Sequence, residues 1–144
     1  MAESGAIPLV GLSRQQDPVE IINSTLRNAG QPVHCNWVRD VSSLGEAMAQ
    51  SGPQLVFLCV ADDDEAQAAI DARNRYATQV PAILVKDAIS EADLVHASEI
   101  GAQDIVKLQA LKRLQSVAIR ELHSARLDNA LAGTLDSARQ YRDQ

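Results

Sequence analysis

Short apolar runs alternate with helical patterns along the chain, and this alternation constrains the fold more than any other feature. Leu55–Val60 is the most continuously apolar run, as expected for a central strand that is buried on both faces. The other runs are shorter, and a helical pattern follows each one: residues 7–12, 33–38, 83–85 and 104–108. Five strand–helix units in about 120 residues predict an α/β domain with an open parallel sheet and right-handed crossovers.

Helix-start signals separate the strands from the helices. Asp17–Glu20, Ser43–Glu46 and Ser90–Asp93 each place a capping residue three positions before an acidic one. We therefore predict that the first residue of each segment is the N-cap of a helix. Glycines at positions 30, 52 and 101 stand where those helices are expected to end.

The final helical pattern is longer than one more layer of this domain needs. Its first apolar stripe, which would cover the sheet, comprises Leu114, Ala118, Leu122 and Ala125. A second stripe lies about half a turn round the helix and comprises Leu127, Leu131, Leu135 and Ala138. We therefore expect a domain over residues 1–125, and an extended helix over residues 126–144 that dimerises or links to another domain. A solvated tail with incidental leucines is the alternative.

Composition and charge exclude several classes of function. The formal net charge of −6 argues against general nucleic-acid binding, which needs a surplus of Lys and Arg. No apolar stretch reaches the roughly 18 residues of a membrane span, and Met1–Ala6 lacks the basic region of a signal peptide. Cys35 and Cys59 lie in apolar runs without metal-ligand spacing. We expect a cytoplasmic protein without a metal site or cofactor.

Trp37 alternates with Val33 and Cys35 in the second apolar run. Residues at this spacing share one face of a strand. We therefore predict that Trp37 belongs to the core.

In an open α/β sheet, ligands bind at the carboxyl ends of the strands. In this chain those ends carry residues 13–14, 59–64, 86–87 and 107–109. They hold three cations, Arg14, Lys86 and Lys107, and one thiol, Cys59. An anion site is one interpretation of the three cations, and a cation cluster that locks one conformation is the other. Apolar flanks favour an inert, buried thiol at Cys59.

Three segments, in their order and spacing, resemble the response-regulator receiver family. Residues 53–60 resemble its third strand, residues 80–85 its fourth, and residues 100–106 the approach to and body of its fifth. The resemblance covers residues 7 to about 125 and implies a flavodoxin/CheY-like fold with strand order 2-1-3-4-5.

The resemblance also implies a phosphorylation site, from which this chain departs. A working receiver has an acidic pair for Mg²⁺, an aspartyl acceptor, a hydroxyl and a lysine. Ser13 and Arg14 match the acidic pair, Cys59 matches the acceptor, and Lys86 matches the hydroxyl. Leu108 matches the lysine, or Lys107 does if the strand shifts by one residue. We therefore expect no enzyme activity and no aspartyl phosphorylation. Asp62, Asp63 and Asp64 lie beyond the strand end and are expected to begin the third helix.

Residues 26–30 and 101–104, together with the altered site, look most like the N-terminal receiver of FimX-type proteins. That resemblance implies downstream PAS, GGDEF and EAL domains, cyclic di-GMP signalling, a place at a cell pole, and control of type IV pili and twitching motility. The expected role is dimerisation and contact with pilus or polar regulatory proteins. The alternatives are a phosphate-independent anion sensor and a stand-alone adaptor of a two-component pathway.

Overall fold

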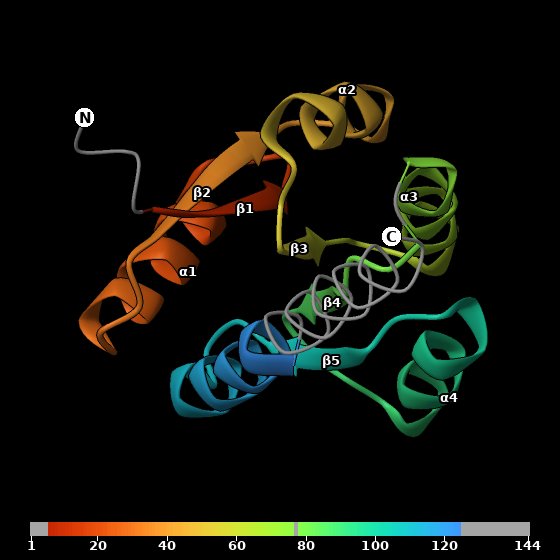
Figure 1. Ribbon diagram of the computed structural model, residues 1–144. Coiled ribbons are helices and arrows are strands. Elements are labelled where there is room, and N and C mark those ends of the chain that lie inside the picture. Colours follow the sequence, from red (N-terminus) through yellow and green to blue (C-terminus); the bar gives the residue numbers. More distant parts are fainter. Residues whose placement is uncertain (1–5, 77, 125–144) are drawn as a thin grey trace, which may run out of the picture.

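The computed structural model describes residues 6–76 and 78–124, which form one parallel sheet covered by helices on both faces (Figure 1). The strands lie in the order β2-β1-β3-β4-β5, as predicted. Their bounds are β1 Ile7–Leu12, β2 Val33–Val38, β3 Leu55–Cys59, β4 Ala82–Lys86 and β5 Asp104–Lys107. The helices are α1 Asp17–Asn28, α2 Val41–Ser51, α3 Asp63–Tyr76 and α4 Glu91–Ile100, followed by a last helix described over residues 111–124.

Alternate residues of each central strand enter two separate cores. Phe57 packs with α1 and the last helix, whereas its neighbour Leu58 packs with α2 and α3. Both side chains are completely buried, so β3 is covered on both faces as its continuous apolar sequence predicts. Figure 1 shows α1 and the blue last helix on one side of the sheet, with α2, α3 and α4 on the other.

A glycine in β1 lets α1 approach the sheet closely. A Cβ at Gly11 would lie 2.9 Å from Cγ2 of Val19 in α1 and 3.1 Å from Sγ of Cys35 in β2. Side chains of α1 also cover the outer edge of β2. Arg27 Nε donates to the Val33 carbonyl, and Asn23 Oδ1 accepts from the Cys35 backbone N–H. These contacts protect a strand edge that is otherwise open to further pairing.

The predicted helix starts are confirmed at α4 and wrong in detail at α1 and α2. At α4, Ser90 and Asp93 form the expected capping box. Helix α1 includes Asp17, and its N-cap residue Gln16 makes no side-chain cap. Helix α2 begins two residues before Ser43, because the Asp40 carboxylate accepts from the Ser43 N–H and takes the capping role.

The core prediction for Trp37 is wrong. The residue is on the expected face of β2, but 36% of its surface is exposed, whereas Val33 is fully buried. Trp37 pairs with Gly11 near the carboxyl end of β2. There the indole N–H donates to the Ser13 carbonyl at 2.8 Å instead of entering the core.

The last helix covers the sheet with the predicted stripe as far as the structure describes it. Leu114, Ala118 and Leu122 are buried, together with Val117. Ala125 and the expected interface residues lie outside the described residues: Leu127, Leu131, Leu135 and Ala138. Among the described helices, none combines the length and the apolar character that crossing a membrane requires.

Candidate functional site

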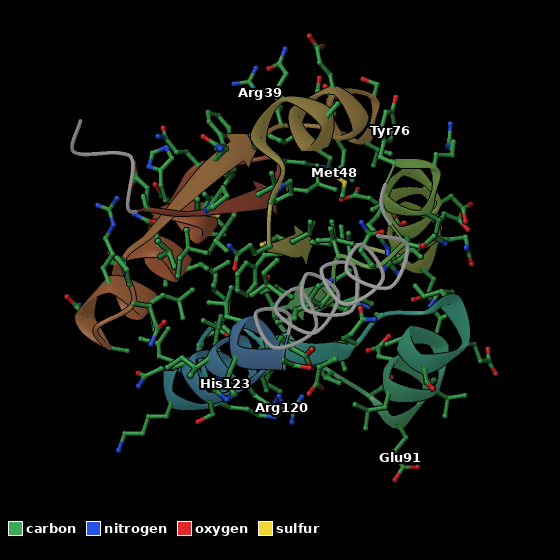
Figure 2. All side chains as sticks on the ribbon, viewed as in Figure 1. Arg39, Met48, Tyr76, Glu91, Arg120 and His123 are labelled. Carbon is green, nitrogen blue, oxygen red and sulfur yellow. The ribbon has the colours of Figure 1, made fainter. Side chains whose placement is uncertain are left out.

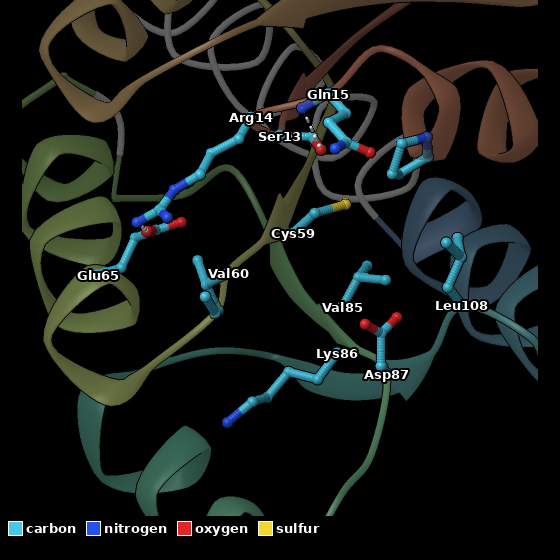
Figure 3. Close-up of a pocket in the computed structure, with 12 residues that line it drawn as sticks. Ser13, Arg14, Gln15, Cys59, Val60, Glu65, Val85, Lys86, Asp87 and Leu108 are labelled. Atoms are coloured by element: carbon cyan, nitrogen blue, oxygen red, sulfur yellow. Dashed lines mark hydrogen bonds and ion pairs between the residues drawn. The ribbon is translucent and has the colours of Figure 1, made fainter.

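The fold brings the predicted site positions together around one hollow at the carboxyl edge of the sheet. Ser13 and Arg14 come from the loop after β1, Cys59 ends β3, Lys86 ends β4, and Leu108 follows β5. The hollow has a volume of about 290 Å³ and is open to solvent (Figure 3). These positions are up to 95 residues apart in the sequence, and the parallel arrangement of the strands joins them.

Leu108 lies at this site, and Lys107 does not. Leu108 lines the hollow, whereas Lys107 is the exposed last residue of β5 and pairs in register with Lys86. Of the two residues that the sequence offers for the lysine of the receiver pattern, the hollow therefore contains Leu108.

Cys59 is a protonated thiol in this environment. Burial raises its pKa to about 12, and the negative charge of Asp87 acts in the same direction. A thiolate, not a thiol, is the reactive form of cysteine. Cys59 is only partly buried, at the wall of the hollow, and its raised pKa favours the unreactive thiol form that its apolar flanks predict.

Arg14 and Glu65 form an ion pair across the mouth of the hollow. The Nη2 atom of Arg14 donates to Oε2 of Glu65 at 2.6 Å, and Figure 3 shows the pair spanning from the loop after β1 to α3. Both residues also line a second hollow of about 470 Å³, next to Arg39 and Val41. The ion pair thus stands between two hollows along the same edge of the sheet.

Lys86 points away from Cys59, into the space between α3 and α4 (Figure 3). Its ammonium lies 3.0 Å from Oδ1 of Asp93 and 3.9 Å from Oδ1 of Asp63. Asp93 is also the capping-box residue of α4. Lys86 therefore ties the end of β4 to the first turn of α4.

Of the three cations, Arg14 and Lys86 line the hollow and Lys107 does not. Arg14 and Lys86 are each paired with a carboxylate of a neighbouring helix, Glu65 and Asp93. Their charges are therefore already balanced by side chains of the protein.

Two carboxylates line the hollow; sequence reasoning placed Asp87 at the strand ends but missed Glu65. Glu65 belongs to the first turn of α3 and is 51 residues from Arg14, so no local pattern indicates their pairing. The other acidic residues at this helix start have a different role. Asp62 accepts from the Glu65 N–H at 2.8 Å, and Asp63 and Asp64 lie in the first turn, as expected for residues that begin a helix.

The residues of the hollow do not fit the Mg²⁺ of a working receiver. Mg²⁺ needs several hard oxygen ligands, but the acidic-pair positions hold Ser13, whose Oγ accepts from the Gln15 N–H, and the cation Arg14. Over residues 6–76 and 78–124, no group of three or more His, Cys, Asp or Glu side chains is placed to hold a metal ion.

Solved structures match this arrangement over most of the chain. The signal receiver domain of a protein assigned as a LuxO repressor, from Vibrio parahaemolyticus, has a TM-score of 0.75 and 16% identity, covering 88% of this chain and 97% of that one. The chain has the receiver-domain fold. NtrX from Brucella abortus also gives a TM-score of 0.75, with 21% identity over 90% of this chain, which spans only 29% of NtrX.

A third structure with the receiver fold is a pilus assembly-related protein from Burkholderia pseudomallei. Its TM-score is 0.68, with 18% identity over 83% of this chain and 91% of that one. No protein-family model and no curated sequence matches the chain. Because the identities are low, these structures establish the fold of the chain and nothing finer.

Proposed function

We propose that this chain is a pseudo-receiver: a signal-transduction module that accepts no phosphoryl group on an aspartate, has no enzyme activity and works through protein contact. One observation carries the proposal. The acceptor position at the end of β3 is Cys59, a thiol whose pKa is raised to about 12. A protonated thiol cannot replace an aspartyl acceptor, and the neighbouring positions lack the ligands for Mg²⁺.

The two ion pairs support a module with one fixed conformation. Arg14–Glu65 joins the loop after β1 to α3, and Lys86–Asp93 joins β4 to α4. In a working receiver, the bound metal and the phosphoryl group bring opposite charges to the site. Here the two ion pairs bring opposite charges to the site, and these charges do not depend on a bound group.

Helix α4 offers a surface for protein contact. Leu94 and Val95 are neighbours on α4, and their exposed fractions are 48% and 58%. Adjacent exposed apolar side chains are typical of interaction surfaces. Lys86 donates a hydrogen bond to Asp93 on the same helix. The proposed contact surface is therefore linked directly to the altered site.

The proposed cellular setting is cyclic di-GMP signalling that regulates type IV pili and twitching motility, with a cytoplasmic place at a cell pole. The sequence resemblance to FimX-type receivers supports this setting, and so does the fold shared with the pilus assembly-related protein. The proposed partners are downstream PAS, GGDEF and EAL domains in the full-length protein and pilus or polar regulatory proteins. An anion sensor has less support, because Arg14 and Lys86 are already paired.

The decisive experiment treats the protein with acetyl phosphate and Mg²⁺ and records its intact mass, together with its light-scattering mass over a concentration series. We expect no covalent adduct and no change in assembly. A stable phosphoryl adduct would overturn the proposal, and Asp87→Asn would show whether the exposed carboxylate of the hollow had accepted it. A positive control restores the family's residues at five positions: Ser13→Asp, Arg14→Asp, Cys59→Asp, Lys86→Thr and Leu108→Lys.

Self-association through residues 126–144 is a separate part of the proposal. Changing Leu131 and Leu135 together to Asp is expected to lower the light-scattering mass and to leave the circular dichroism of the domain unchanged. A variant that associates as before, or that loses its fold, would remove this segment from the proposal.

A further inference from the structure

Trp37 forms an exposed anchor on a different part of the surface from α4. It is the only tryptophan in the sequence, and it lies on β2, at the opposite edge of the sheet from β5. Large aromatic side chains contribute most to stability when they are buried. An aromatic side chain that remains 36% exposed therefore leaves apolar surface available for a partner.

The indole ring is held in place before any partner binds. Its N–H donates to the Ser13 carbonyl at 2.8 Å, and the guanidinium carbon of Arg39 lies 5.4 Å from the ring centroid. A side chain that is already ordered loses little conformational entropy on binding. Tryptophan and arginine are also the residue types most enriched among the energetic centres of protein interfaces.

The charge beside the ring is positive. In the part of the chain that the structure describes, Arg39 makes no ion pair. The adjacent Asp40 carboxylate is engaged at the start of α2, where it accepts from the Ser42 hydroxyl and the Ser43 N–H. Arg39 lies at the outer rim of the molecule, near α2 (Figure 2).

A hollow continues this surface toward the candidate site. It is lined by Arg39, Asp40 and Val41, together with Leu12, Arg14 and Glu65. The surface therefore combines a fixed aromatic ring, a guanidinium that makes no ion pair among the described residues, and a recess lined in part by apolar side chains. We call Trp37, Arg39 and Val41 the Trp37 patch.

We propose that the Trp37 patch binds an acidic segment of a partner protein, with a carboxylate on Arg39 and an apolar side chain against the indole ring and Val41. Charge complementarity selects this occupant, because a guanidinium forms its strongest hydrogen bonds with carboxylates and phosphates. The inference goes beyond the proposed function because it concerns a second surface and does not depend on the phosphorylation site.

The fluorescence of Trp37 reports directly on the patch, because the sequence contains no other tryptophan. We would titrate the protein with short peptides in which Glu and Asp flank one Leu, Ile, Met or Phe, and with matched peptides that carry Lys in place of the acids. We expect a saturable shift with acidic peptides alone, weakened by salt. Arg39→Gln should lower the affinity about tenfold or more.

The matched control is Arg75→Gln on α3, which removes an exposed arginine elsewhere and should leave the affinity unchanged. Circular dichroism should show that both variants are folded. The proposal is overturned if no acidic peptide gives a saturable shift, if the Lys peptides bind equally well, or if Arg39→Gln binds like the unmodified protein. Saturation by inorganic polyphosphate, with no response to the acidic peptides, would assign the patch to a phosphate ligand instead.

Discussion

Arg14 and Glu65 form a 2.6 Å ion pair that joins the loop after β1 to the first turn of α3. The sequence resemblance matches Arg14 to one of the family's acidic-pair positions. The Arg14 side chain remains 71% exposed, whereas Glu65 is 16% exposed. The Arg14 side chain is therefore largely at the surface, whereas Glu65 is largely enclosed at the wall of the site.

Breaking this pair should change the site more than the stability. Because exposed ion pairs contribute little, we expect Arg14→Ala to lower the free energy of unfolding by only about 0.5 kcal/mol. Urea unfolding of Arg14→Ala, Glu65→Gln and the double variant measures the coupling between the two residues. A loss of several kcal/mol from Arg14→Ala alone would show that the pair holds the fold together.

Asp93 should make the protein sensitive to acid. Hydrogen bonds from Ser90 and Lys86 lower the pKa of Asp93 from 3.8 to about 2. Since the folded pKa is the lower one, this contribution to stability is present above pH 3.8 and is lost as the pH falls through about 2. Unfolding of the unmodified protein and of Asp93→Asn should therefore differ near neutral pH and converge in acid. A difference that stays constant with pH would contradict this assignment.

Cys59 should react slowly with alkylating reagents at neutral pH. Its pKa is raised from 9.0 to about 12, so the reactive thiolate is scarce. Mass spectrometry after iodoacetamide treatment should show alkylation at least about tenfold slower in the folded protein than in urea. The stability that comes from keeping this thiol neutral should decline as the pH rises from 9.0 toward about 12. Fast labelling of the native protein would indicate an activated thiol.

Arg73 should be the most sensitive charged position in the described fold. Its side chain is only 3% exposed, and it donates to three backbone carbonyls, those of Thr78, Val80 and Gly101. Arg73→Met removes all these donors and leaves the carbonyls unsatisfied, so we expect a loss of about 3 kcal/mol in urea unfolding. The exposed Arg75 on the same helix is the control, and Arg75→Met should change stability by no more than about 0.5 kcal/mol. Equal effects of the two substitutions would refute the role of Arg73.

The sequence by itself determined the order of the elements, because strand burial and helix capping leave local signals. The continuous apolar run of β3 and the Ser90–Asp93 capping box both appear in the structure where the sequence places them. The position of Cys59 at the site also follows from the sequence, since parallel strands end at a common edge, whereas the sequence left both Lys107 and Leu108 open.

Only the tertiary structure decided how these positions interact. The pairing of Arg14 with Glu65 depends on the fold bringing the first turn of α3 to the loop after β1, across 51 residues of sequence. Trp37 follows the period of a buried strand, yet it is exposed because its N–H bonds the Ser13 carbonyl near the open end of the sheet. Local patterns indicate which face of a strand or helix a side chain occupies. Burial and charge pairing depend on the elements that pack there from distant parts of the sequence.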